Sequence, residues 1–435
     1  MARPGCVRLI LPTLLLIPFS LSASKAQPVE GATGVLTLEA AVTEALQQNP
    51  KLSARQAHSD AKARLPSQRG ALPDPSLSFK ALNLPTDTFA LDQEPMTQLQ
   101  VGLNQTFPFP GKLGLRQRIA ERESGASNEQ TSEVRIQLVR DVKTIWWQLF
   151  FLDRALETVQ RNQELLHQFV EVAETKYEVG LGLQQDVLLA QLELSRLLDN
   201  ELTLQGKRRV AEASLAEFMD YSGEVSLKLP STADDELPRL PPDEVLLEKA
   251  RTARPLLAQR LRLQEAARSR LDLSEKDYMP DFKLGVAYGF RQGDNLDGSA
   301  RSDFASVMLS VNLPLYAGSK QDQAVKQRAY ELSAAKDELR EAHAQMRASV
   351  SQAIADYGRA RDQVGLFKNG IIPQAQQTVE SMLAGYQVGV VDFLNLVRSQ
   401  IMLYNYETQY WQALSEARQA HARLAAAIGS EGIDE

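Results

Sequence analysis

Residue types that often do chemistry are present, but their spacing does not build a site. The four histidines, His58, His167, His343 and His421, occur without an HxxxH or HExxH pattern, and Cys6 is the only cysteine. A zinc or other transition-metal site needs several such ligands at short, regular spacing. The sequence therefore predicts no metal site, no cofactor and no catalytic residue.

A phosphate-binding glycine loop is not found either. The stretch Val179-Gly180-Leu181-Gly182 has two close glycines, but it follows a helical run rather than a strand and has no third glycine. Nucleotide binding by that motif requires a preceding strand and a following helix N-terminus. We therefore expect a protein that is not an enzyme and binds no nucleotide.

The same stretch belongs to a pair of related segments. Residues 177–191 and 386–400 each place a glycine, Gly180 or Gly389, between two long runs with heptad-like apolar spacing. A glycine at such a point predicts a left-handed helix cap and a tight reversal of the chain. We expect two long helical hairpins.

The two predicted reversals carry apolar side chains. Apolar tips on exposed hairpins would suit a surface that a partner covers. They would equally suit ordinary helix caps that make their own hydrophobic contacts, and the sequence leaves both readings open. The tip residues are Val179, Gly180 and Leu181 in the first hairpin and Val388, Gly389 and Val390 in the second.

The pair of hairpins is part of a longer tandem repeat. Gly180 and Gly389 are 209 positions apart (389 minus 180), and three further landmarks recur in the same order at offsets of 205 to 207. So long a period indicates duplication of a domain-sized unit. The landmarks are Pro50-Lys51-Leu52 with Pro255-Leu256-Leu257, Leu72-Pro73-Asp74 with Met279-Pro280-Asp281, and residues 101–109 with residues 307–315.

The beginning of the chain is typical of a secretory signal peptide. Arg3 precedes an apolar run from Leu9 to Leu21, which is too short to span a bilayer, and Ser24-Lys25-Ala26 offers small residues for cleavage. Loss of residues 1–26 would remove Cys6, so no lipid anchor is expected, and would change the net charge from −7 to −10 because three basic residues leave. An acidic chain argues against nucleic acid as a partner.

Each half also contains two segments whose apolar residues alternate with small or polar ones. They lie at residues 76–79 and 98–104 in the first half and at 282–290 and 307–313 in the second, with polar loops between them. Strands of about ten residues with one apolar face match tilted transmembrane β-strands, and they also match a half-buried sheet in a soluble domain. Four strands cannot close a barrel, and lipid does not tolerate an open sheet edge. Membrane insertion would therefore require several chains to share one barrel.

Long helices make up most of the remaining chain. Apolar residues from Leu138 to Val159 follow a strict 4-3 spacing typical of a coiled-coil seam, and Asn49-Pro50 and Pro373 predict local breaks. The predicted organisation is a signal peptide at 1–26, a first repeat at 27–221, an inter-repeat linker at 222–243, a second repeat at 244–429 and a short tail at 430–435.

The order of these features resembles the TolC-like outer membrane efflux proteins. The features are Leu36-Thr37-Leu38-Glu39-Ala40, Asn49-Pro50, a strand pair and a long hairpin with Tyr-x-x-Gly, with the later features repeated once. The resemblance implies a mainly α fold with a small transmembrane β part, in which three chains form a twelve-stranded barrel and a helical tunnel across the periplasm. It implies a homotrimer in the outer membrane of a Gram-negative bacterium.

The resemblance further implies a passive exit duct that works with a periplasmic adaptor and an inner-membrane pump of the resistance-nodulation-division class. Residues 82–85, 94–97 and 105–113 resemble the heavy-metal efflux branch, so heavy-metal cations are the expected cargo. Two alternatives remain open. The same channel could serve drug export or type I protein secretion, or the chain could be a soluble periplasmic coiled-coil scaffold or adaptor.

Particular residues acquire expected roles from the same resemblance. The apolar tips would contact the adaptor. Asp186, Asp392, Asn395 and Arg398 would lie at the periplasmic gate, where Arg398 could pair with Asp186 or Asp392 of a neighbouring helix.

Overall fold

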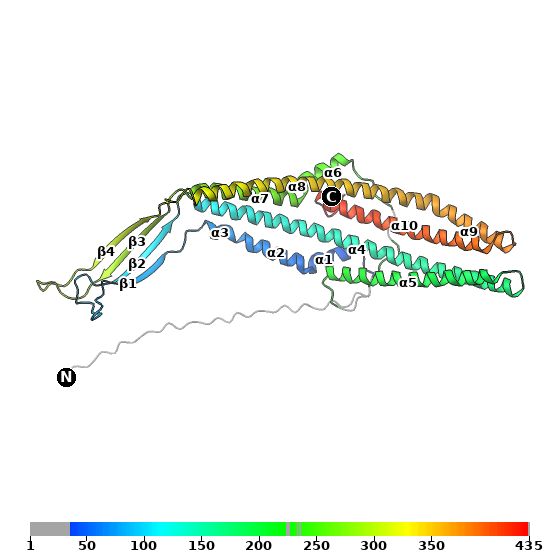
Figure 1. Cartoon of the computed structure of the whole chain (residues 1–435), viewed down its shortest axis with the longest axis horizontal. Coiled ribbons are helices and arrows are strands. Elements are labelled where there is room, and N and C mark those ends of the chain that lie inside the picture. Colours follow the sequence, from blue (N-terminus) through cyan, green and yellow to red (C-terminus); the bar gives the residue numbers. More distant parts are fainter. Residues whose placement is uncertain (1–34, 223–226, 233, 235, 434–435) are drawn as a thin grey trace, which may run out of the picture.

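The computed structural model describes residues 35–222, 227–232, 234 and 236–433 (Figure 1). The predicted signal peptide therefore lies outside the described residues. Helices run side by side over most of the length, and a small four-stranded sheet projects from one end (Figure 1). The predicted mainly helical fold with a small β part is confirmed.

Three short helices begin the described chain, α1 (Leu38–Gln48), α2 (Pro50–Ala63) and α3 (Leu65–Gly70). The predicted break at Asn49-Pro50 separates α1 from α2. Asn49 caps α2, because its Oδ1 accepts from the Leu52 N–H at 3.1 Å. Its Nδ2 also donates to the Phe218 carbonyl at 2.9 Å, which ties this break to a distant helix.

The sheet joins the two halves of the chain. Its strands β1 (Ser76–Leu82), β2 (Gln98–Phe107), β3 (Phe282–Phe290) and β4 (Phe304–Val311) lie in chain order, and every neighbouring pair is antiparallel. The four predicted strands are therefore confirmed. The β2–β3 pair connects the first half to the second, which leaves β1 and β4 as the two edges.

The register places most of the large apolar residues of the four strands on one face. Leu77 lies opposite Leu103, which lies opposite Val286, which lies opposite Val307. None of the described residues covers this face, and Phe79 and Val307 are 74% and 78% exposed. The exposed large apolar residues on it are Leu77, Phe79, Leu99, Leu103, Phe107, Leu284, Val286, Tyr288, Phe290, Val307, Leu309 and Val311.

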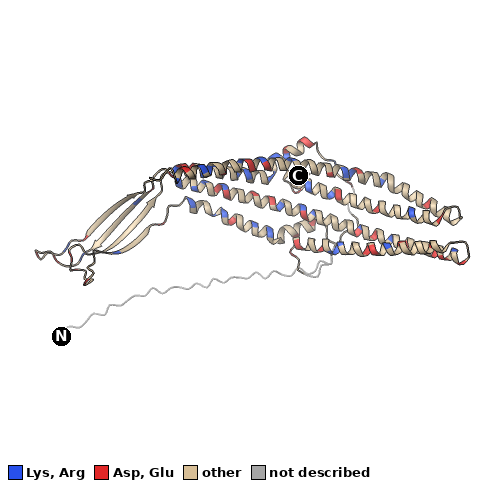
Figure 2. Ribbon diagram, viewed as in Figure 1, with Lys and Arg blue, Asp and Glu red and all other residues tan. Residues whose placement is uncertain are grey.

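The opposite face of the sheet is mainly polar or small, with Leu82, Phe304 and Met308 as the large apolar exceptions. One row across it consists of Ser78, Gly102, Ala287 and Ser306. The only charged residues in the four strands are two lysines on this face, whereas the helices carry charges along their whole length (Figure 2).

Two long helical hairpins extend away from the sheet. The first consists of α4 (Lys112–Glu178) and α5 (Gln184–Phe218). The second consists of α8 (Gln321–Leu366), a π-helical turn η1 (Phe367–Ile371), α9 (Ile372–Gln387) and α10 (Phe393–Ile428). Between them lie α6 (Asp243–Ala253) and α7 (Pro255–Lys276).

The predicted break near Pro373 takes the form of the π-helical turn η1. The proline lies in the first turn of α9, directly after η1. A wide turn accommodates a residue that cannot donate a backbone hydrogen bond to the preceding turn. The helix therefore continues past the proline.

The predicted coiled-coil seam of α4 packs inside the helical layer. Val142, Leu149 and Val159 are completely buried. Next to the seam, Trp146 and Trp147 are also buried, with ring centroids 5.0 Å apart. These side chains hold the helices together, as expected from the apolar spacing.

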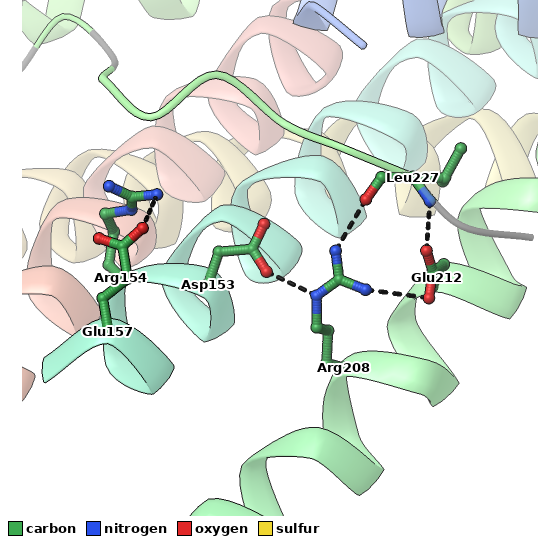
Figure 3. A network of polar contacts seen from close by, with 6 residues as sticks. All are labelled: Asp153, Arg154, Glu157, Arg208, Glu212 and Leu227. Carbon is green, nitrogen blue, oxygen red and sulfur yellow. Dashed lines mark hydrogen bonds and ion pairs between the residues drawn. The ribbon is translucent and has the colours of Figure 1, made fainter. Parts of the chain in front are cut away.

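The described end of the inter-repeat linker is fixed to the first hairpin by Arg208 (Figure 3). The guanidinium donates to Asp153 at 2.6 Å, to the Leu227 carbonyl at 2.7 Å and to Glu212 at 3.1 Å. Burial opposes the charge on Arg208, but the hydrogen bonds with the two carboxylates outweigh it, and the pKa of Arg208 is raised.

Candidate functional site

Both hairpin tips lie at the end of the molecule opposite the sheet (Figure 1). The long helices make this separation necessary, because α4 alone has 67 residues and each residue of an α-helix adds about 1.5 Å. The candidate site is therefore the pair of tips and the first turns of helix behind them.

The first tip is a left-handed helix cap centred on Gly180. This glycine has φ 75°, and the N–H groups of Leu181 and Gly182 both donate to the Lys176 carbonyl, at 2.8 and 2.9 Å. A bond that returns five residues closes the end of α4 and satisfies a carbonyl that would otherwise lack a partner.

The second tip repeats this geometry around Gly389. Its φ is 79°, and the N–H groups of Val390 and Val391 donate to the Gly385 carbonyl at 2.9 and 3.2 Å. Asp392 then caps α10, because its Oδ1 accepts from the Leu394 N–H at 3.2 Å. The predicted reversals are thus the same turn made twice.

The apolar side chains at the tips point away from the helical layer. Val179 is 64% exposed and Leu181 is 80% exposed in the first tip, and Val388 and Val390 are similarly exposed in the second. The caps are made by the backbone alone, without help from these side chains. In the single chain the tips are therefore an exposed apolar surface. Whether a partner covers them stays a prediction.

Lys176 joins the two tips. Its ammonium donates to the Tyr386 carbonyl at 2.7 Å and lies 3.9 Å from the centroid of the Tyr386 ring. The same ring packs against Phe393, with centroids 5.2 Å apart. The Tyr386 hydroxyl is buried and has no hydrogen-bond partner among the described residues.

Two acids lie close to this contact. Burial raises the pKa of Asp186, and the nearby carboxylate of Asp392 raises it further, while the Leu183 backbone and Lys176 oppose the shift. Burial also raises the pKa of Tyr386, with further contributions from both acids. The structure therefore brings Asp186 and Asp392 together at one place.

The other two expected gate residues lie further along α10. Asn395 and Arg398 are both exposed and, being three residues apart, share one side of the helix. In the described part of the chain, Arg398 forms no ion pair with Asp186 or Asp392. The expected pairing with a neighbouring helix stays a prediction.

Sequence reasoning missed the roles of Lys176 and Tyr386. A signal was present, because each tip has a tyrosine three residues before its glycine, Tyr177 and Tyr386, but only the second is buried. The two tips thus repeat in backbone and differ in their side-chain contacts.

A second polar cluster lies at the other end of the helices, where they meet the sheet. Lys112 is 3% exposed, and its ammonium donates to Asp281 at 2.9 Å and to the Met279 carbonyl at 3.0 Å. Asp277 lies 3.4 Å from the same ammonium, and Asp281 also accepts from the Phe109 N–H at 2.8 Å. This cluster connects the first half of the chain to the second.

The described residues offer neither a metal cluster nor a membrane-spanning helix. Within them, no three His, Cys, Asp or Glu side chains are grouped so that they could hold a metal ion. No described helix combines the length and the apolar composition needed to cross a bilayer.

Known proteins resemble this chain in sequence. Outer membrane protein TolC of Escherichia coli is 23% identical over 293 residues, which is 65% of this chain and 58% of TolC. The cobalt-zinc-cadmium resistance protein CzcC of Cupriavidus metallidurans is 21% identical over 404 residues, which is 92% of this chain and 91% of CzcC. The chain thus spans little more than half of TolC but nearly all of CzcC.

Solved structures resemble it in fold. CusC superposes with a TM-score of 0.77 at 17% identity, covering 90% of this chain and 92% of CusC. VceC from Vibrio cholerae gives 0.73 at 19% identity, covering 91% and 96% of the two chains. The sequence profile of the outer membrane efflux proteins matches residues 41–219 and 246–430, one match in each half. The chain belongs to the outer membrane efflux protein family.

Proposed function

We propose that this protein is the outer membrane channel of a tripartite efflux system, and that heavy-metal cations are its cargo. In this proposal three chains share one barrel and one helical tunnel. The channel is passive, and contact with a periplasmic adaptor and an inner-membrane pump of the resistance-nodulation-division class opens it. Family membership supports the general activity, and the features below support its parts.

The observation that carries the proposal is the uncovered apolar face of the sheet. Twelve large apolar side chains are exposed on one side of the four strands, and the other side is mainly polar or small. Exposed apolar surface of this extent marks a contact with lipid or protein. A lipid-facing outer surface and a polar inner surface are the pattern of a transmembrane barrel.

The open edges of the sheet support assembly from several chains. β1 and β4 each have only one neighbouring strand in this chain. Unpaired backbone groups are not tolerated in lipid, and four strands are too few to close on themselves. Three chains would provide twelve strands and leave no edge.

The hairpin tips support docking of a second protein. Leu181 and Val390 are 80% and 81% exposed, at the end of the molecule farthest from the sheet (Figure 1). A channel held in the outer membrane would present this end to the periplasm. Apolar tips there suit an adaptor, and Asp186, Asp392, Asn395 and Arg398 lie close enough behind them to regulate the opening.

The cargo is supported by the name and coverage of one relative. CzcC is a cobalt-zinc-cadmium resistance protein, and its match extends over nine-tenths of both chains. The TolC match covers much less of its relative, and its name states no cargo. A channel for drugs or for type I protein secretion stays the alternative. A soluble scaffold is disfavoured, because it would leave the apolar sheet face in water.

Membrane fractionation tests the channel against the scaffold. We expect the protein to stay with outer membranes through washes with high salt and with carbonate, and to leave them only with detergent. Release by salt alone would rule out the channel.

Growth assays test the cargo. A strain lacking the gene should become sensitive to cobalt, zinc, cadmium, copper or silver, and the intact gene should restore resistance. Sensitivity confined to drugs, or loss of protein secretion with normal metal resistance, would replace the metal cargo by the corresponding alternative.

A further inference from the structure

The repeat in the sequence is also a repeat in the register of the sheet. The offset is 207 from β1 to β3 and 206 from β2 to β4, taken from Asp74 with Asp281 and from Val101 with Val307. Phe79 and Val101 are paired in the sheet. Adding the offsets to these two numbers gives Val286 and Val307, which are paired as well. The two strand pairs are therefore structurally equivalent, residue by residue.

The same offsets give the residues equivalent to those in the contact between the two halves. In that contact β2 pairs with β3, with Asn104 opposite Gly285 and Leu103 opposite Val286. The equivalent of β2 is β4, and the equivalent of β3 is β1. Within one chain β1 and β4 are opposite edges, so this pairing can form only with β1 of a second copy.

These equivalences specify a register for that pairing. Ser310 of one copy would lie opposite Ser78 of the next, and Leu309 would lie opposite Phe79. The apolar residues then stay on the apolar face, and the small polar residues stay on the other face. A shift of one residue would mix the two faces.

The Lys112 cluster supplies a polar part of the same contact. Asp281 binds the Phe109 N–H and the Lys112 ammonium. Its equivalent in the first repeat is Asp74, which is exposed and has no side-chain partner among the described residues. The equivalent of Phe109 is Leu315, whose N–H donates to the Leu313 carbonyl at 2.9 Å, so only the lysine contact can be repeated. Lys320 follows the glycine of this junction as Lys112 follows Gly111, with one residue inserted.

A second ion pair between the halves also has equivalent residues in the other repeat. Arg270 of α7 pairs with Glu123 of α4. Ala61-Lys62-Ala63-Arg64-Leu65 answers Ala267-Arg268-Ser269-Arg270-Leu271, so Arg64 is the equivalent of Arg270. The equivalent of Glu123 is Glu331, 208 positions later. The same offset aligns buried residues of α4 and α8, Leu138 with Met346 and Val142 with Val350.

The equivalent residues are available for a partner in the single chain. Arg64, Asp74 and Lys320 are exposed and make no ion pair in the described part of the chain. Among the described residues Glu331 forms its ion pair and side-chain hydrogen bond within its own helix, with Arg328 at 2.6 Å and Gln327 at 2.9 Å. One edge of the molecule thus offers Arg64 and Asp74, and the other offers Lys320 and Glu331, with opposite charges at equivalent places.

We propose that successive copies of this chain associate by repeating its internal contact: β4 pairs with β1 of the next copy with Ser310 opposite Ser78, Asp74 binds the Lys320 ammonium, and Arg64 pairs with Glu331. The second copy is the occupant that the internal repeat specifies. This inference rests on the proposed function, which requires several chains to share one barrel, and it adds the register and the ion pairs that close it.

Cysteine cross-linking tests the register. Ser78→Cys and Ser310→Cys are introduced together in a Cys6→Ser background, and membranes are treated with a mild oxidant. Directly opposite residues have Cβ atoms about 5 Å apart, close to disulfide geometry, whereas β1 and β4 of one chain are three strand spacings, about 14 Å, apart. We therefore expect covalent dimers and trimers on a non-reducing gel.

The matched control carries Ser76→Cys and Ser306→Cys, also serines on the polar face of the edge strands. In the proposed register Ser306 lies opposite Leu82, six residues and about 20 Å from Ser76, so this variant should remain monomeric on the gel. Cross-linking of the control but not of the Ser78/Ser310 variant would overturn the register.

Charge reversal tests the ion pairs independently of cysteine chemistry. Asp74→Lys and Lys320→Asp should each increase the fraction of monomer after mild heating by roughly tenfold, because like charges then meet at the contact. The double variant should restore trimers close to the wild-type level. Single variants as stable as the wild type, or a double variant no better than either single, would overturn the pairing of these two residues.

The outcomes separate this inference from the proposed function. A native particle of three chains in which Ser78 and Ser310 do not cross-link refutes the register and leaves the channel intact. A native particle of one chain in detergent refutes both.

Discussion

Replacement of Lys112 by methionine tests how the two halves of the chain are joined where the helices meet the sheet. Methionine keeps most of the length of the side chain but removes the ammonium, which contacts Asp281, Asp277 and the Met279 carbonyl. The sheet and both hairpins stay otherwise unchanged. The variant therefore isolates the charged contact between the halves.

The expected loss can be worked out from the environment of each partner. An unpaired buried charge destabilises a protein by about 3–5 kcal/mol. Asp281 would keep the Phe109 N–H at 2.8 Å, and its side chain is 31% exposed, so water offsets part of the loss. Asp277 is half exposed and contributes little. We expect Lys112→Met to lower the free energy of unfolding by about 2–3 kcal/mol.

The pH dependence of this loss follows from the pKa of Asp281. Burial opposes its ionisation, but the Phe109 N–H and the Lys112 ammonium outweigh burial and lower its pKa. Because the folded pKa is below the unfolded value of about 3.9, the stabilisation is present above that value and is lost as the pH falls through the folded pKa. The difference between variant and wild type should be constant above about pH 5 and shrink below about pH 3.5.

The assay is guanidinium unfolding in detergent, followed by circular dichroism, for Lys112→Met, Asp281→Asn and the double variant. The coupling energy between the two sites should be about 1–3 kcal/mol. Lys207→Met removes an exposed lysine and serves as the control, with an expected change within about 0.5 kcal/mol. A Lys112 variant as stable as this control, or a coupling energy of zero, would refute the reasoning.

Three further predictions concern the tips and the gate. Gly180→Val and Gly389→Val should each strain the left-handed cap by about 1–2 kcal/mol and abolish efflux with trimers intact. The control Gly206→Val, in an open helical position, should not abolish efflux. Metal resistance equal to the wild type in both tip variants would contradict this prediction. Because burial raises the pKa of Asp186, the tip contact should become more stable as the pH falls towards that pKa, and Asp186→Asn should remove this dependence in hydrogen exchange of residues 176–186; equal dependence in the two proteins would count against it. Arg398→Glu should change single-channel conductance and antibiotic leakage, and unchanged values for both would remove Arg398 from the gate.

Much of the fold could be predicted from local patterns. Alternation gave the four strands, long heptad runs gave the hairpins, and Asn49-Pro50 gave the first break. The two glycine reversals were also predictable, because a left-handed cap depends on the glycine and its immediate neighbours. These features need no knowledge of which distant segments meet.

The features that sequence reasoning missed all depend on distant contacts. Lys112 follows a glycine at the start of a helix and has the pattern of an exposed lysine, yet it is buried against Asp281, 169 positions away. Lys176 contacts Tyr386 across 210 positions. Nothing in the immediate sequence of either lysine indicates its partner, because the partner is set by how the halves pack.

The contacts between copies could be inferred only from the sequence and the structure together. The sequence supplied the offsets between the halves, and the structure supplied the register of β2 and β3 and the partners of Asp281. Neither alone specifies that Asp74 should meet Lys320 of another copy.

The native mass of the purified protein in mild detergent tests the central claim most directly. A four-stranded sheet with two open edges and an uncovered apolar face should persist only as part of a shared barrel. We therefore predict a particle of three chains that precipitates when the detergent is removed. A monodisperse single chain that stays folded and dissolved without detergent would contradict the account.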